Sequence, residues 1–215
     1  MSARTLSAET IQLIAQEVRT CTLCGLASGR TRAVPGEGPA DARIMLIGEG
    51  PGFHEDRQGR PFVGPSGKFL DDLLALAGLS RETVFIANVV KCRPPQNRDP
   101  QPDEIAICTE HYLYRQIVAL DPPVIVTLGR FSMGLFMPGE RIMRIHGQPR
   151  NIDGRLVVPM LHPAAALHQP QNRPLIEADF RRLPEILAQA EAALRPAAAA
   201  PKASDEPPLE QLSLF

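Results

Sequence analysis

The chain has 215 residues, enough for one α/β domain with a sizeable core, and its 44% hydrophobic and 22% charged residues are typical of a globular protein. No apolar run approaches the roughly 20 residues of a membrane span, and the N-terminus has no signal-peptide pattern, so we expect a cytoplasmic protein. The net charge of −1 argues against a uniformly basic nucleic-acid binder, but residues 197–215 carry −2, which leaves +1 on residues 1–196 and allows a local basic face.

Apolar strands alternate with helices along the chain. Residues 7–20 have helical periodicity, with Ser7 as the expected N-cap. Further helices are expected at 64–78, with Ser66 as N-cap, and at 103–120, 129–136 and 174–194. Buried strands are expected at 43–47, 83–90, 124–128 and 156–160. This alternation predicts an α/β fold with a parallel sheet covered on both faces.

The composition changes near residue 195, where alanine, proline and charged residues replace the apolar periodicity. Such a segment cannot bury enough apolar surface to fold. We therefore predict one domain over residues 1–196 and a disordered tail over residues 197–215.

A loop rich in glycine and proline follows the first strand, over residues 48–64. It carries Glu49, Glu55 and Asp56 at the carboxyl end of that strand, where open α/β sheets bind their ligands. Glycines bring backbone N–H groups close to a ligand, and carboxylates hold a proton or a water. The loop therefore predicts a hydrolytic site.

Two further polar residues follow expected strands. Asn88 is the one polar side chain in the apolar run from Val84 to Val90, and His162 comes directly after the last strand. A buried amide without partners is costly, which favours a ligand-binding role for Asn88 over a structural one. Both side chains are expected at the same edge of the sheet as the glycine-rich loop.

The four cysteines indicate a metal or cluster site. Cys21 and Cys24 form a C-x-x-C pair, and Cys92 and Cys108 are separated by 15 residues. Disulfides are rare in the cytosol, so four cysteines with this spacing are better explained as thiolate ligands. The spacing alone leaves zinc and an iron–sulfur cluster equally open.

Six motifs in this order resemble the family 4 uracil-DNA glycosylases, the thermostable-type enzymes of bacteria and archaea: Cys21-x-x-Cys24, Gly48-Glu49-Gly50-Pro51-Gly52, Gly59-Arg60-Pro61-Phe62-Val63-Gly64, Asn88-Val89-Val90-Lys91-Cys92-Arg93-Pro94-Pro95 with Asn97-Arg98, Cys108, and His162-Pro163-Ala164. Each motif is weak alone, but their combination from about residue 21 to 194 is specific. The resemblance implies a three-layer α/β/α sandwich with a short parallel sheet. It also implies a structural 4Fe–4S cluster on Cys21, Cys24, Cys92 and Cys108.

The resemblance implies DNA repair by base excision: hydrolysis of the N-glycosidic bond of uracil in single- or double-stranded DNA, leaving an abasic site. The nucleotide must be flipped into a pocket before the bond is reached. Phe62 would stack on the base, and Asn88 would read its Watson–Crick edge. His162 would stabilise the negative charge that develops on the uracil O2.

The resemblance assigns the remaining work to the acidic loop. Glu49 and Gly50 would line the pocket floor, and Glu55 would lie near uracil C5 and exclude the methyl group of thymine. Glu49 is the preferred carboxylate for holding the attacking water, with Asp56 and Asn97 as helpers. Which of these carboxylates faces the water is left open.

Several residues are candidates for contacts to DNA. The phosphate candidates are Ser66, Arg93, Arg98, Arg144 and Arg173, with Arg141 as a further basic residue. Leu167 is either a wedge that fills the vacated base stack or a core leucine. Among the histidines, His146 is interpreted as surface or structural.

The last five residues, Gln211, Leu212, Ser213, Leu214 and Phe215, resemble the pentapeptide with which bacterial repair and replication proteins bind the sliding clamp. We expect a nucleoid-associated monomer with DNA and this clamp as partners.

Two other functions fit parts of the sequence. A cluster-bearing protein that binds or cross-links uracil-containing DNA with little turnover would share most of the motifs. An iron–sulfur electron carrier would need the cysteines but not Phe62, Asn88 and His162, and is therefore ranked last.

Overall fold

A computed structural model describes residues 3–194, and the C-terminal pentapeptide lies outside these residues. Its sheet has five strands in the order β2-β1-β3-β5-β4. Their bounds are Ile44–Gly48 for β1, Phe85–Asn88 for β2, Val124–Leu128 for β3, Arg150–Ile152 for β4 and Arg155–Met160 for β5. All neighbouring pairs are parallel except β4 with β5. The predicted α/β fold is confirmed.

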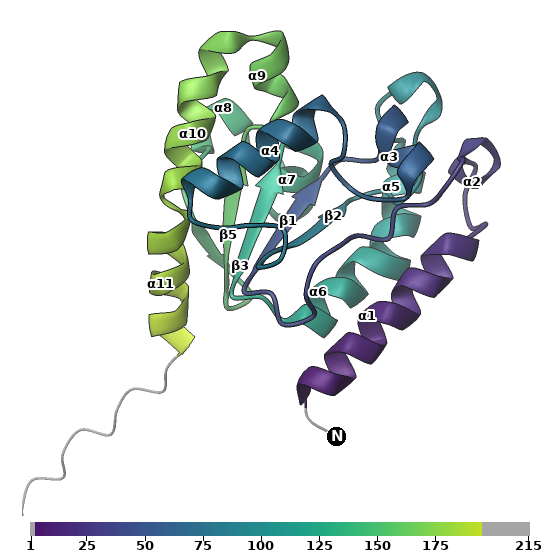
Figure 1. The fold of residues 1–215 in the computed structure, drawn as a ribbon, viewed down its shortest axis with the longest axis horizontal. Coiled ribbons are helices and arrows are strands. Elements are labelled where there is room, and N and C mark those ends of the chain that lie inside the picture. Colours follow the sequence, from purple (N-terminus) through teal and green to yellow (C-terminus); the bar gives the residue numbers. More distant parts are fainter. Residues whose placement is uncertain (1–2, 195–215) are drawn as a thin grey trace, which may run out of the picture.

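Helices cover both faces of the sheet and give three layers (Figure 1). One layer contains α1, Ala3–Thr20, with α5, Pro102–Cys108, and α6, Tyr114–Leu120. The opposite layer contains α4, Pro65–Leu76, α10, Arg173–Arg181, and α11, Leu183–Leu194. Shorter helices complete the fold: α2 Leu26–Gly29, α3 Phe53–Gln58, α7 Arg130–Phe136, α8 Ile142–Ile145 and α9 Ala164–His168. None of the helices between residues 3 and 194 has the length and apolar composition of a bilayer-spanning segment.

The core follows from the period of two along each strand. In β1, Met45 and Ile47 pack with α1 and α6, whereas Ile44 and Leu46 pack with α4 and α11. All five β1 residues are buried, as expected for a strand covered on both faces. Two apolar cores therefore lie on either side of one sheet.

Several sequence-based boundaries differ from the structure. Helix α1 begins before Ser7, and Gly64 rather than Ser66 is the N-cap of α4, so both predicted N-caps are wrong. The predicted last helix is interrupted at Arg182, just before Pro184, whose ring lacks the N–H of a continuous helix. The segment 103–120 contains a π-helical turn, Thr109–Leu113, directly after Cys108.

Several short elements were not expected from the sequence, namely β4 and the helices α2, α3, α8 and α9. The short strand β4 is largely exposed and antiparallel, so the sheet is mixed rather than purely parallel. The helix α3 lies inside the glycine-rich loop, between Gly52 and Gly59.

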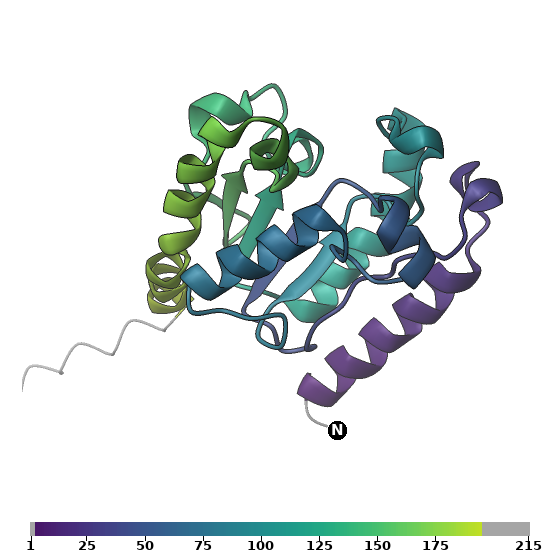
Figure 2. The same cartoon turned by 45° about the horizontal axis from the view of Figure 1, so that its top comes forward.

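The parallel strands all end at the same edge of the sheet, at the top of Figure 1, and Figure 2 brings this edge forward. The loop and α3 after β1, Asn88 at the end of β2, and His162 after β5 lie along this edge. The topology thus brings the predicted site residues together.

Candidate active site

A small pocket at the carboxyl edge of the sheet joins the predicted site residues. Its lining comes from the loop after β1, the first turn of α4, the end of β2 and the segment just after β5. The lining residues are Gly50, Gly52, Glu55, Phe62, Ser66, Asn88 and His162. The lining combines one aromatic ring, one amide, one imidazole and one carboxylate, which suits a flat, polar-edged ligand.

Asn88 presents an unpaired amide oxygen in this pocket. The residue is 2% exposed, and its Oδ1 is one of three buried side-chain atoms in the described part of the chain that have no hydrogen-bond partner. Its neighbour in register across the sheet is Gly48, where an added Cβ would lie 2.5 Å from Asn88 Oδ1 and 2.7 Å from the Phe62 ring. Glycine at position 48 therefore leaves room for both side chains, and the ligand is expected to supply the missing donor.

The ring of Phe62 stacks on that of His162, with 5.5 Å between ring centroids and 26° between their planes. Phe62 has a φ of 52°, a left-handed conformation that bulky residues rarely adopt. This backbone is part of the turn that aims the ring into the pocket instead of along the sheet.

The protonation of His162 follows from its contacts. Its Nδ1 accepts a hydrogen bond from the Ala164 N–H at 3.1 Å, so the neutral ring carries its proton on Nε2. Burial lowers the pKa of His162 to about 4, with an opposing contribution from Glu55. The site therefore contains a neutral imidazole with one N–H free to donate.

The carboxylates of the loop have separate environments. Glu55 accepts hydrogen bonds from the N–H groups of Gly52, Val63 and Gly64, at 3.1, 2.8 and 2.9 Å. Asp56 is 4% exposed and accepts from the Thr31 N–H at 2.8 Å. Glu55 thus shapes the pocket wall, whereas Asp56 fixes a distant loop and is not among the pocket residues.

Glu49 is half-buried at the end of β1 and has no side-chain hydrogen bond within the described residues. Burial raises its pKa, the charge of Asp99 raises it further, and Arg130 opposes both. It does not line the pocket itself, since the lining on that side comes from Gly50 and Gly52. Of the three loop carboxylates, Glu55 and Asp56 accept hydrogen bonds from the backbone, so Glu49 is the one that can accept a hydrogen bond from a water or a substrate.

The four cysteines, which are all free thiols, line a second pocket with Val18, Leu26, Lys91, Ile107 and Tyr112. Cys92 accepts a hydrogen bond from Arg30 Nη1 at 3.1 Å, and Cys108 accepts one from the Lys91 N–H at 3.2 Å. Burial raises the pKa of the Cys92 thiol, and it raises the pKa of the Cys108 thiol to about 11. Within residues 3–194, no three Cys, His, Asp or Glu side chains surround a point suited to one metal ion.

Comparison with known proteins agrees with this geometry. The model of the uracil DNA glycosylase superfamily matches residues 35–187. A type-4 uracil-DNA glycosylase of Saccharolobus solfataricus is 51% identical over 189 residues, which covers 83% of this chain and 87% of that protein. One of Thermotoga maritima is 44% identical and covers 76% and 86%. A type-5 uracil-DNA glycosylase of Thermus thermophilus is 38% identical but covers only 47% of this chain. The chain belongs to the type-4 uracil-DNA glycosylases.

In this member of the type-4 family, several residues predicted to contact DNA have protein partners. Arg98 forms two hydrogen bonds with Glu104, at 2.7 and 2.9 Å, and Arg173 pairs with Glu177 at 2.8 Å. Asn97 Oδ1 accepts from Arg93 Nε at 2.7 Å, which orients Asn97 in an exposed turn outside the pocket. Ser66 lines the pocket at the first turn of α4.

The structure resolves two of the open interpretations. Leu167, on α9 just after His162, is 49% exposed, so the alternative of a core leucine is wrong. His146 Nδ1 forms a partly buried hydrogen bond of 2.7 Å with Asp179 Oδ2, so the structural interpretation is confirmed.

Two features of this family member were missed from the sequence. Phe53, at the start of α3, is 48% exposed, and Arg93 and Arg57 lie 5.3 and 5.6 Å from its ring. A broad surface depression beside α3 is lined by Arg19, Arg30, Arg32 and Arg60 with Thr31, Ala33, Gln58 and Gly59. The position of Phe53 in the glycine-rich loop was a usable signal in the sequence. The arginines come from three separate segments, so only the folded chain brings them together.

Proposed function

We propose that this type-4 uracil-DNA glycosylase flips deoxyuridine out of DNA and hydrolyses its N-glycosidic bond, releasing uracil and leaving an abasic site. The observation that carries the proposal is the buried, unpaired Oδ1 of Asn88 in a pocket shared with Phe62 and His162. Family membership supports the same reaction, because the relatives are named for it.

Recognition of uracil is assigned to Asn88 and Phe62. The amide oxygen of Asn88 accepts from uracil N3–H, and its NH₂ group donates to O4. Cytosine presents the opposite pattern at both positions, so its binding would leave buried groups unpaired. Stacking on Phe62 contributes roughly 1–3 kcal/mol without distinguishing the bases.

Exclusion of thymine is assigned to the wall built on Glu55. Its carboxylate is occupied by three backbone N–H groups, so the wall is fixed by hydrogen bonds and cannot retreat freely from a C5 methyl group. The backbone of Gly50 forms the floor, consistent with its place in the pocket.

Bond cleavage is assigned to His162 and Glu49. As the bond to the sugar breaks, negative charge develops on uracil, and the Nε2–H of neutral His162 donates to O2. The sugar gains positive charge, which the Glu49 carboxylate stabilises while it holds the attacking water. Asp56 and Asn97 contribute through the loops that they fix, because their side chains bind backbone and Arg93 respectively.

We propose that the cysteine pocket holds a 4Fe–4S cluster. Membership of the type-4 family supports this proposal, and so do the four free thiols that line one largely apolar pocket. A cluster of this kind takes one thiolate at each of its four irons, which matches the number of cysteines. Cys21, Cys24, Cys92 and Cys108 would hold the cluster, which joins the end of α1 to the loop after β2.

DNA is proposed to lie across the carboxyl edge of the sheet. Exposed Arg144, together with Arg93, Arg98, Arg173 and the hydroxyl of Ser66, would contact phosphates, and Leu167 would fill the vacated stack. The C-terminal pentapeptide, residues 211–215, is proposed to bind the sliding clamp. We further propose that the enzyme acts as a monomer at the nucleoid.

The test is incubation with single- and double-stranded oligonucleotides that contain one uracil, followed by alkali. We expect free uracil, and strand cleavage at that position only after alkali, because the enzyme is monofunctional. Matched oligonucleotides with cytosine or thymine are expected to stay intact. Absence of uracil release from both substrates would overturn the proposal.

A further inference from the structure

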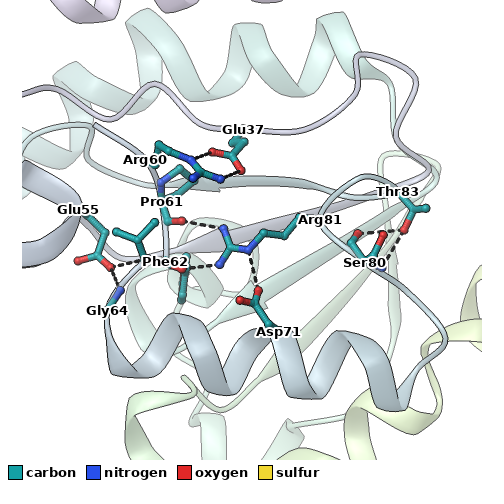
Figure 3. A network of polar contacts seen from close by, with 11 residues as sticks. Glu37, Glu55, Arg60, Pro61, Phe62, Gly64, Asp71, Ser80, Arg81 and Thr83 are labelled. Carbon is teal, nitrogen blue, oxygen red and sulfur yellow. Dashed lines mark hydrogen bonds and ion pairs between the residues drawn. The ribbon is translucent and has the colours of Figure 1, made fainter. Parts of the chain in front are cut away.

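The turn Pro61–Gly64 carries the Phe62 ring, and two side chains from elsewhere in the chain bind its backbone (Figure 3). Glu55 accepts from the N–H groups of Val63 and Gly64, at 2.8 and 2.9 Å. From the opposite side, Arg81 Nη1 donates to the Pro61 carbonyl at 3.0 Å, and Arg81 Nη2 donates to the Phe62 carbonyl. The Glu55 carboxylate therefore binds the N–H groups of this turn, and the Arg81 guanidinium binds its carbonyl groups.

This turn needs external support because of the conformation of Phe62. A φ of 52° is unfavourable for a residue with a bulky side chain and persists only where the surroundings impose it. Helix α4 packs tightly against the same peptide, since a Cβ added at Gly67 would lie 1.8 Å from the Phe62 carbonyl oxygen. The Phe62 carbonyl thus lies between Gly67 and the guanidinium of Arg81.

Arg81 is itself aligned before any ligand binds. Its Nε lies 2.6 Å from Asp71 Oδ1 on α4, and its side chain is only 17% exposed. Its backbone belongs to the turn between α4 and β2, where Thr83 bonds to Ser80 through both backbone and hydroxyl (Figure 3). Arg81 does not line the uracil pocket, so any effect on the substrate passes through the turn.

We propose that Arg81, aligned by Asp71, is a positioning residue that fixes the Phe62 ring for stacking on uracil. The proposal rests on the function given above, since Phe62 is the stacking residue there. Arginine suits this role because its planar fork donates to two carbonyls at once, whereas the single ammonium of lysine cannot reproduce that geometry.

A neighbouring ion pair provides the matched control. Arg60 Nε and Nη2 donate to the Glu37 carboxylate at 2.6 and 2.7 Å, close to the same turn, but within residues 3–194 the Arg60 side chain forms no hydrogen bond with the backbone of Phe62 (Figure 3). Arg60 and Arg81 therefore differ in whether the guanidinium binds the Phe62 carbonyl.

The first test is a double-mutant cycle on a uracil-containing oligonucleotide, with Arg81→Ala, Phe62→Ala and the double variant. We expect Arg81→Ala to raise KM about tenfold with a smaller change in kcat, the scale of one lost stacking contact, and Arg60→Ala to stay within about twofold. In the Phe62→Ala background, Arg81→Ala should add little. Arg81→Lys should recover only part of the loss.

The second test measures the mobility of the ring at position 62 by fluorescence. This is feasible because the chain contains no tryptophan that would add to the signal. Phe62→Trp introduces the one tryptophan of the chain, and its fluorescence anisotropy, excited where the two tyrosines absorb little, reports the order of the ring. Adding Arg81→Ala or Asp71→Asn should lower the anisotropy, whereas adding Arg60→Ala should not. Asp71→Asn keeps the guanidinium and serves if the Arg81→Ala protein does not fold.

The proposal is overturned if the Arg81 and Asp71 variants match Arg60→Ala in KM and anisotropy, or if Arg81→Ala has the same effect with and without Phe62. A wild-type protein that releases no uracil would instead overturn the proposed function, while the anisotropy test would still stand.

Discussion

The proposed uracil pocket and the cysteine pocket are supported in different ways. The uracil pocket is held by internal hydrogen bonds, with Glu55 on one side of the Phe62 turn and Arg81 on the other. The cysteine pocket is formed by the end of α1, the loop after β2 and the end of α5, and its thiols have few hydrogen-bond donors. The first pocket should therefore persist without a ligand, whereas the second should depend on the proposed cluster.

The two pockets are nonetheless connected through buried Lys91. Its Nζ donates to the Asn88 carbonyl at 2.8 Å and to Gln116 Oε1 at 2.7 Å, while its backbone N–H donates to Cys108. Loss of the proposed cluster is expected to shift Asn88 through the hydrogen bonds of Lys91. Substitutions in the uracil pocket are expected to leave the cluster in place. Single substitutions in each pocket can test this asymmetry.

The largest effect is expected for Cys108→Ser. Because binding of a metal centre is coupled to folding, removal of one thiolate should cost both the cofactor and much of the thermal stability. Iron, acid-labile sulfide and the unfolding midpoint should all fall, and uracil release with them. A variant that loses its iron but melts like the wild type would contradict the asymmetry.

Glu49→Gln should reduce the rate of uracil release by about 10²- to 10⁴-fold, as expected when a general base is removed. In the proposed mechanism Glu49 acts as a carboxylate, and burial raises its pKa, so wild-type activity should begin to fall at a higher pH than an ordinary glutamate would cause. The variant should lose this acidic limb while retaining iron and stability. An unchanged limb in Glu49→Gln would assign it to another group.

His162→Ala should lower kcat by about 10²- to 10³-fold, the usual cost of one donor to a developing oxyanion. The wild type should also lose stability as the pH falls below about 6.5 toward about 4, because the unfolded histidine binds a proton that the folded one resists. Denaturant midpoints across this range should therefore fall less in the variant. Equal pH dependence in both proteins would contradict the neutral imidazole.

Leu167→Ala should have the smallest effect and only on duplex DNA, where a vacated stack must be filled. We expect a several-fold loss on double-stranded and none on single-stranded substrate, since unpaired bases leave no stack to refill. Exposed Leu175, 39% accessible on α10, offers a matched Leu→Ala control. Equal losses on both substrates would exclude the wedge.

The sequence predicted the sheet because buried strands covered on both faces are nearly continuous apolar runs, as β1 and β3 are. It also predicted Asn88, because a lone amide in such a run is conspicuous. Strand β4 was missed because three residues, two of them exposed, are too few to show an alternating pattern. Helix α3 was missed because it is short and lies in a segment rich in glycine and proline.

Long-range contacts set the limit of that reasoning. The role of Asp56 depends on the Thr31 N–H, 25 residues away, and that of Arg81 on a carbonyl 19 residues away. Neither pairing has a local periodicity, so both depend on the folded topology.

The most direct test of the central claim compares uracil release by the wild type, Asn88→Ala and Asn151→Ala, whose exposed asparagine serves only a surface turn. Removing the amide should cut kcat/KM for uracil by about 10- to 100-fold, the cost of an unmet buried hydrogen bond, with iron content and melting temperature unchanged. Asn151→Ala should match the wild type. Wild-type activity in Asn88→Ala would contradict the claim that this amide reads the uracil edge.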